Sequence, residues 1–248
     1  PELRPFPNQR YGAAVMPVLE YEEVQRATEE QWRKTIAANG TGNLYGPYTP
    51  FCEALAANTP EESYALRLQW AKHFAKLVHR FDPQGKWLTD SWDFIAMPSV
   101  WTPERRKAYF EDLRKEGITD YMMMYDTAGD IGPQYMNTEY FYGVDWAFGI
   151  LHSFQGEDQL HGNMPGILSQ VQGLLKDPKA SHLTGLFHIP ESYGHNPMYF
   201  HLTTQLAWDP EGMSMERFTD EWCKRRYRPE SYNAMRTATE KVIQASYS

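Results

Sequence analysis

The 248-residue sequence predicts an α/β fold in which helices cover a parallel sheet. Apolar segments of strand length alternate with helical segments of about ten to twenty residues, which is the pattern of successive βαβ units. Five strands are expected from clear apolar runs, and residues 11–19 form a weaker sixth candidate. Because a closed (β/α)8 barrel needs eight strands, the pattern leaves two alternatives, an open sheet and the later part of such a barrel.

The five expected strands are short apolar runs that each end beside a polar or aromatic side chain. They cover residues 43–48, 86–92, 118–126, 144–152 and 183–189. The opening residues 1–9 contain three prolines, and because proline fixes φ and has no N–H to donate, we expect no regular structure there.

The expected helices have recognisable start and stop signals. Thr59 and Thr102 each precede a proline and an acidic residue, which predicts an N-cap followed by proline at the first helical position. Gly117 is placed to end the second of these helices, because glycine readily adopts the left-handed conformation found there. The expected helices cover residues 22–37, 60–80, 103–116 and 166–175.

The sequence becomes purely helical beyond Pro210. Ser214 is the expected N-cap of the first of two helices, and the second starts at about Glu230. We therefore predict two domains, a partial barrel over residues 1–210 and the start of an all-helical domain over residues 211–248.

The composition limits the class of partner. The formal net charge is −8 and no run of Lys or Arg is longer than three residues, which argues against nucleic acid and against an anionic membrane surface. No apolar stretch is long enough for a membrane span, and no leader pattern opens the sequence. Aromatic residues make up 15% of the chain, which suits both a packed core and a site that stacks neutral sugar rings. Nothing in the sequence indicates an oligomeric state.

We predict neither a cofactor nor a metal. No Gly-rich phosphate loop follows any expected strand, so the usual signature of a nucleotide cofactor is missing. His182, His188, His195 and His201 cluster in the sequence, but their spacing matches no zinc-binding pattern. The two cysteines lie far apart in the chain, which leaves room for one disulfide at most.

Polar or aromatic groups follow all five expected strands, at the ends where (β/α)8 enzymes carry their sites. In chain order they are Glu53, Trp92 with Asp90 and Asp93, Asp126 with Asp130, His152, and Glu191 with His195, Asn196 and Tyr199. Any one of them could simply cap a helix or accept loop N–H groups. Glu53 and Glu191, however, supply the two carboxylates that hydrolysis of a glycosidic bond needs as acid/base and nucleophile. They form the candidate catalytic pair.

Five motifs occur in a fixed order along the chain. They are Tyr45-Gly46 with Phe51-Cys52-Glu53, the strand from Trp87 to Phe94, Leu151-His152-Ser153-Phe154, the block from Gly185 through Pro190-Glu191 to Asn196 and Tyr199, and Arg225-Arg226-Tyr227. In this order they resemble the α-N-acetylglucosaminidases of glycoside hydrolase family 89, over about residues 43–248. The resemblance implies a (β/α)8 TIM-type barrel, of which this chain holds the later strands, with further strands expected ahead of residue 1.

The resemblance also implies roles for the site residues. Glu53 corresponds to the acid/base and Glu191 to the nucleophile of a retaining exo-glycosidase that removes terminal α-linked N-acetylglucosamine from a glycan or oligosaccharide. Because these glutamates follow strands four apart, their side chains must lean toward the barrel axis to meet. The expected substrate-binding residues are Cys52, Trp92, Trp146, His152, Asn196 and Tyr199.

Three positions depart from the family pattern. Cys52 and Ser153 stand where the family has asparagine, and Ser192 stands where it has glycine. A glycosidase of the same fold that acts on another sugar is therefore an alternative, as is a carbohydrate-binding protein without activity.

The resemblance also implies a location, and we expect the protein to be secreted, periplasmic or lysosomal.

Overall fold

The structure is a computed structural model whose described residues divide into two compact units. The first comprises residues 1–126 and 132–147, and the second comprises residues 127–131 and 148–248. Within these bounds the structure describes residues 3–5, 15–17, 21–46, 59–152, 160–191 and 196–248.

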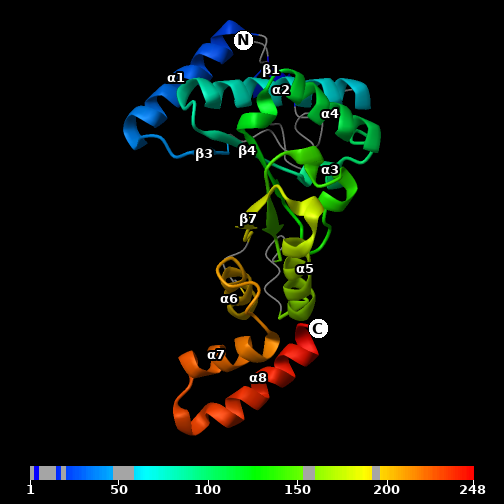
Figure 1. Cartoon of the computed structure of the whole chain (residues 1–248). Helices are drawn as coiled ribbons and strands as arrows, with labels where there is room; N and C mark the ends of the chain where they lie inside the picture. Colours follow the sequence, from blue (N-terminus) through cyan, green and yellow to red (C-terminus); the bar gives the residue numbers. More distant parts are fainter. Residues whose placement is uncertain (1–2, 6–14, 18–20, 47–58, 153–159, 192–195) are drawn as a thin grey trace. The chain divides into compact units, whose positions relative to one another are not determined.

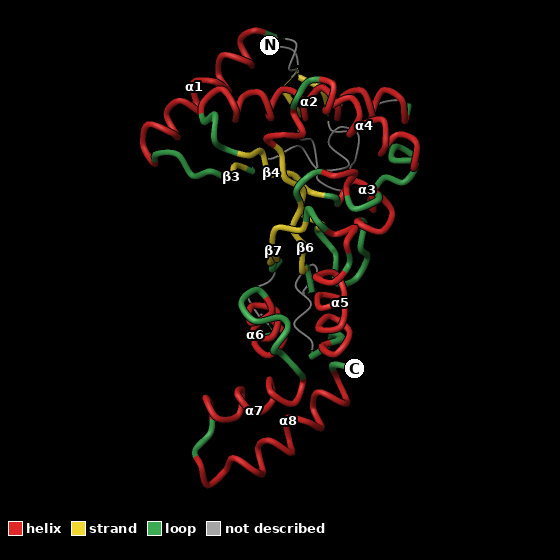
Figure 2. Tube along the Cα trace, in the orientation of Figure 1, coloured by secondary structure: helices red, strands yellow, loops and turns green. Residues whose placement is uncertain are grey.

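The main sheet has five strands in the order β3-β4-β5-β6-β7, which is also their order in the sequence. Figure 2 draws strands in yellow. The strands run parallel, as the registers of β3 on β4 and of β4 on β5 illustrate. This arrangement confirms the parallel α/β class and amounts to about half of a TIM-type barrel. The strands are β3 (Leu44–Tyr45), β4 (Lys86–Asp90), β5 (Met122–Asp126), β6 (Trp146–Ile150) and β7 (Leu183–His188).

The helices begin where the sequence signals predicted. The hydroxyl of Thr59 accepts the N–H of Glu62 at 3.1 Å, and the hydroxyl of Ser214 accepts the N–H of Arg217 at 3.1 Å. Gly117 follows the second capped helix with φ 70°, the left-handed conformation expected of a terminating glycine. The described helices are α1 (Glu22–Asn39), α2 (Pro60–Phe81), α3 (Trp92–Ala96), α4 (Pro103–Lys115), α5 (Met164–Lys176), α6 (Pro197–Leu206), α7 (Met215–Arg226) and α8 (Tyr232–Ser246).

The first residues of the chain correct one prediction. Instead of lacking regular structure, Leu3–Pro5 forms β1, which pairs antiparallel with β2 (Val15–Pro17). Proline is tolerated because it occupies a strand end in this two-stranded ribbon, where no inner ladder bond depends on its missing N–H. Within the weaker sixth candidate over residues 11–19, the described residues Val15–Pro17 form a strand, which lies outside the main sheet.

Three further segments differ from the sequence prediction. Ile118–Tyr121 is a 3₁₀ turn instead of the start of a strand, although Ile118 is fully buried, which explains its apolar pattern. The predicted strand that reached Trp92 ends at Asp90, and Trp92 opens α3. Helix α6 was not predicted at all, although it begins with an asparagine N-cap and a proline at its first position.

Each unit has its own apolar core. In the first unit the rings of Phe110, Phe141 and Trp146 are fully buried, and Phe110 lies 6.4 Å from Phe141 between ring centroids. In the second unit α5 packs on α6 and α7 packs on α8 (Figure 1). The free thiol of Cys223 is buried there, 3.5 Å from the hydroxyl of Thr239. Among the described helices, none combines the length and apolar character that a bilayer crossing requires.

Candidate functional site

The predicted nucleophile follows β7 at its carboxyl end. Glu191 is exposed there, and the N–H of Ile189 donates to the carbonyl of Ile150 at 2.9 Å, which extends the pairing of β6 and β7 to their ends. His152 follows β6, so the groups after these two neighbouring strands share one edge of the sheet. Glu53 and Cys52 lie outside the described residues, and their predicted roles stay predictions.

Three of the predicted substrate-binding residues come together in the second unit. The ring of His152 stacks on that of Tyr199 with centroids 3.9 Å apart and planes 11° apart. The ring of His152 also stacks on that of His161, with centroids 4.4 Å apart and planes 25° apart. The side chain of Asn196 adjoins both ends of this column, accepting the N–H of Tyr199 at 3.3 Å and donating to the carbonyl of His161 at 3.4 Å. We call Asp130, His152, His161, Asn196 and Tyr199 the histidine stack.

Asp130 fixes the backbone at the end of β6. Its carboxylate accepts the N–H groups of Leu151 and His152, each at 3.1 Å, and the hydroxyl of Tyr199 at 3.3 Å. These bonds hold His152 at φ 50°, a left-handed conformation that side chains other than glycine rarely adopt. Burial raises the pKa of Asp130, and the donors that face it oppose that rise.

The environment of the stack keeps His152 neutral. Burial, together with the charge of His161, lowers the pKa of His152 to about 4. The imidazole is 3% exposed, and its Nε2 atom has no hydrogen-bond partner among the described residues. The neutral ring is thus enclosed by its two stacking partners, and its Nε2 atom is left without a partner in the part of the chain that the structure describes.

Gly162 makes room for the stack. Its φ is 116°, and a Cβ atom at this position would lie 2.9 Å from the ring of Tyr199 and 3.0 Å from Cε1 of His152. Any larger residue would therefore push the two rings apart. His161 and Gly162 are not among the residues predicted from the sequence, where the available signal is their position just before the asparagine that caps α5.

A second polar cluster forms at the carboxyl end of β4 in the first unit. The carboxylate of Asp90 accepts the N–H of Trp92 at 3.0 Å and the hydroxyl of Tyr125 at 3.2 Å. Burial raises the pKa of Asp90 to about 6, and the charge of Asp93 adds to this effect. Asp93 is itself paired with Arg67, whose buried guanidinium lies 2.5 Å away. Trp92 is partly exposed beside this cluster, and its contact with a sugar stays a prediction.

Asp126, at the carboxyl end of β5, and Trp146, which opens β6 at its amino end, make contacts typical of structural residues. Asp126 accepts the N–H groups of Gln134 and Tyr135, each at 2.9 Å, which is the loop-bonding role considered for such residues. Trp146 is fully buried and stacks on Tyr135 at 5.2 Å between centroids. This environment suits a core residue, and contact of Trp146 with a sugar stays a prediction.

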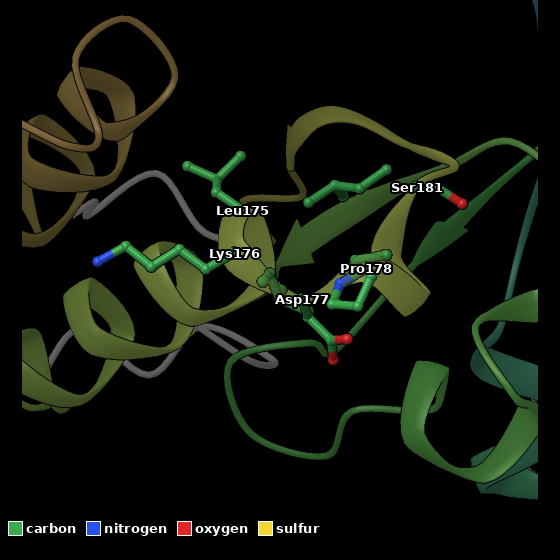
Figure 3. Close-up of a pocket in the computed structure, with 8 residues that line it drawn as sticks. Leu175, Lys176, Asp177, Pro178 and Ser181 are labelled. Atoms are coloured by element: carbon green, nitrogen blue, oxygen red, sulfur yellow. The ribbon is translucent and has the colours of Figure 1, made fainter.

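A cavity of about 370 Å³ opens at the amino end of β7 (Figure 3). It is lined by Leu174, Leu175, Lys176, Asp177, Pro178, Ala180, Ser181 and Leu183. Because Glu191 follows the carboxyl end of the same strand, this cavity belongs to the opposite edge of the sheet. Among the described residues, no three His, Cys, Asp or Glu side chains are grouped as a metal site would require.

Comparison with known proteins identifies the family. The family model described as the alpha-N-acetylglucosaminidase (NAGLU) TIM-barrel domain matches residues 17–210. The chain belongs to this family. The human alpha-N-acetylglucosaminidase is 24% identical over 176 residues, which cover 71% of this chain and 22% of the human protein.

Solved structures support the same fold. A family 89 glycoside hydrolase from Clostridium perfringens, in complex with PUGNAc, superposes with a TM-score of 0.66 at 18% identity. The same comparison covers 94% of this chain and 24% of the bacterial enzyme. A variant of that organism's enzyme, in complex with its substrate GlcNAc-alpha-1,4-galactose, gives a TM-score of 0.67 at 16% identity. The chain thus spans about a quarter of the length of these relatives.

Proposed function

We propose that this chain supplies catalytic residues of a retaining exo-glycosidase that removes terminal α-linked N-acetylglucosamine from glycans. Membership of the alpha-N-acetylglucosaminidase family carries the proposal. The exposed position of Glu191 after β7 supports it, because barrel enzymes place catalytic carboxylates at this edge. A relative was solved with GlcNAc-alpha-1,4-galactose as its substrate, so a terminal N-acetylglucosamine is the substrate group that we propose here.

The proposed mechanism uses the two glutamates in turn. Glu53 donates a proton to the glycosidic oxygen while the Glu191 carboxylate attacks the anomeric carbon, which releases the aglycone and leaves a glycosyl ester on Glu191. Glu53, now ionised, takes a proton from a water molecule that attacks the same carbon and frees the sugar and Glu191. This sequence needs the two carboxyl groups about 5–5.5 Å apart.

The proposed sugar contacts come from the predicted substrate-binding residues. Trp92 would stack on an apolar face of the sugar ring, as partly exposed aromatic rings do at carbohydrate sites. His152, Tyr199 and Asn196 would hold the wall that follows β6 and β7. Cys52 would lie near the substituent on sugar carbon 2, where the resemblance places an asparagine.

Substitution of the nucleophile tests this mechanism. In the intact protein, Glu191→Gln should lower kcat on an aryl α-N-acetylglucosaminide by about 10³-fold or more, because glutamine cannot form the glycosyl ester. In Glu191→Ala, whose short side chain leaves room for an external anion, added azide should restore turnover of the activated aryl substrate and yield a glycosyl azide. Glu230→Gln, at an exposed position in the helical segment, is the matched control and should keep the parent kcat. Parent-level kcat in Glu191→Gln would refute the assignment.

The three departures from the family pattern favour one alternative, a glycosidase of the same fold for another sugar. Cys52 and Ser153 each replace an amide by a smaller group, which changes what a 2-acetamido substituent could bond to. A panel of aryl α- and β-glycosides separates the two possibilities by kcat/KM. A protein that binds sugars by calorimetry but turns over none of the panel would instead be a carbohydrate-binding protein.

We also propose a secreted, periplasmic or lysosomal location, where glycans are commonly degraded, and a domain boundary near residue 210. Fractionation of the source cells, followed by immunoblotting, tests the location. A boundary at residue 210 predicts that limited proteolysis of the intact protein cuts next to Pro210 before it cuts within α7 or α8.

A further inference from the structure

The last helix contributes a residue to the histidine stack. Tyr247 follows α8, is 1% exposed, and donates its hydroxyl to Oδ1 of Asn196 at 2.7 Å. Its backbone carbonyl accepts the N–H of Met164 at 2.8 Å, which provides a partner for an N–H in the first turn of α5. The C-terminus accordingly lies beside α5 (Figure 1).

Asn196 connects Tyr247 to the rings. Its Oδ1 atom accepts from two donors, the hydroxyl of Tyr247 and the N–H of Tyr199, while its Nδ2 atom donates to the carbonyl of His161. Tyr199 and His161 are the two rings that stack on His152. One amide side chain, 5% exposed, therefore ties the outer rings of the column to the end of α8.

We propose that Tyr247 is a positioning residue for the sugar subsite, because its hydroxyl fixes the amide of Asn196 and thereby the Tyr199–His152 stack. This inference rests on the proposed function. It makes residues 211–248 part of the site's construction, since the bond joins Asn196 to a residue 51 positions later in the chain.

The physical reason lies in the two ends of an amide. A carbonyl oxygen accepts and an NH₂ group donates, so the observed bonds are satisfied in only one orientation of the Asn196 side chain. Loss of the Tyr247 hydroxyl removes the shorter of the two bonds to Oδ1 and leaves a buried acceptor partly unsatisfied. The amide can then rotate, and the N-terminus of α6, which carries Tyr199, is free to shift.

Tyr247→Phe is the primary test, because phenylalanine keeps the buried ring and removes only the hydroxyl. In the intact protein we expect kcat/KM on an aryl α-N-acetylglucosaminide to fall by about tenfold, mainly through a higher KM, since small displacements of site residues have effects of this order or larger. The control is Tyr232→Phe, which removes a hydroxyl bonded to Asp220 from the same helix and should keep the parent constants. Equal losses in both variants would overturn the proposal.

A double-mutant cycle tests whether Tyr247 acts through Asn196. In an Asn196→Ala background, Tyr247→Phe should cause no further loss in kcat/KM, because the bond it removes is already absent. If instead the fold-losses in kcat/KM of the two single variants multiply in the double variant, Tyr247 acts independently of Asn196 and the proposal is overturned.

A spectroscopic measurement separates this inference from the proposed function. The imidazole signals of His152 and His161, observed by ¹H–¹⁵N NMR, should move in Tyr247→Phe and stay in place in Tyr232→Phe, because ring stacking sets their shifts. Moved signals in a protein that hydrolyses no glycoside would refute the glycosidase function and keep the positioning of the stack. Unmoved signals would refute the positioning itself.

Discussion

Asp90 shows how this fold alters a single acid. Burial raises the pKa of its carboxyl to about 6, and the neighbouring charge of Asp93 acts in the same direction, although Asp93 is paired with Arg67. Bonds from the N–H of Trp92 and the hydroxyl of Tyr125 oppose the rise without cancelling it. Asp90 is therefore about half protonated near pH 6.

The sign of the effect on stability follows from linkage. An aspartate whose folded pKa lies above its ordinary value of 3.8 favours the folded state while it is protonated, and this contribution is lost as the pH rises from about 4 to about 6. Asp90→Asn, which stays neutral, should then gain up to about 3 kcal/mol in free energy of unfolding at pH 7 relative to the parent and little at pH 4.

A carboxyl ¹³C titration, assigned with the Asp90→Asn variant, checks the pKa, and urea unfolding at the two pH values checks the sign. Asp209→Asn is a suitable comparison, because the hydrogen bond from Arg217 lowers the pKa of Asp209. The stability that Asp209 contributes is therefore lost as the pH falls below about 4, which is the opposite direction to Asp90. A titration midpoint near 4 for Asp90 would contradict the prediction.

At the level of single residues, the sequence indicates candidate site residues but not their hydrogen-bond partners. Glu191, His152, Asn196 and Tyr199 are predicted as site residues because they follow apolar strand segments, a local pattern. The bond from Tyr247 to Asn196 could not be found in this way, because hydrogen bonds between distant positions leave no periodic trace in the sequence. For Trp146 the composition could not decide, since large aromatics serve cores and sugar sites alike.

At the scale of elements, the N-cap of α2 allows a direct test. The hydroxyl of Thr59 accepts the N–H of Glu62 at 3.1 Å, so Thr59→Ala leaves one N–H of the first turn without this partner. We expect a loss of about 1 kcal/mol in the free energy of unfolding of the first unit. Urea unfolding measures it, and Thr59→Ser, which keeps a capping hydroxyl, should lose much less. Equal losses in the two variants would argue that the cap is not the cause.

The same capping chemistry explains which elements could be predicted. Threonine or serine followed by proline or acidic residues located the starts of α2, α4 and α7. Asn196-Pro197 carries an equivalent signal for α6, which was interpreted as part of a functional motif and not as a helix start. The 3₁₀ turn at Ile118–Tyr121 could not be predicted from the sequence, because a buried apolar residue gives the same sequence pattern in a strand and in a tight turn.

At the scale of the whole chain, the alternation of strands and helices was enough to predict the parallel sheet and its five strands. The sequence pattern alone could not distinguish an open sheet from part of a barrel, because a closed barrel needs eight strands and the pattern indicates five. The division of the described residues into two compact units was also not foreseen, since the first unit resumes at residue 132 after five residues assigned to the second. Contact between segments far apart in sequence determines such units.

The two units predict separate local responses to core mutations. Phe110 is fully buried in the first unit beside Tyr109 and Phe141, and Leu202 is fully buried in the second, on α6. Phe110→Ala should lower the free energy of unfolding by about 3–5 kcal/mol and Leu202→Ala by about 2–5 kcal/mol. Because contacts cluster within the units, hydrogen exchange followed by mass spectrometry should show each variant losing protection mainly in its own unit. Similar losses in both units for either variant would mean that the chain opens as one cooperative body, and the capping and stack variants would then have to be interpreted as global changes.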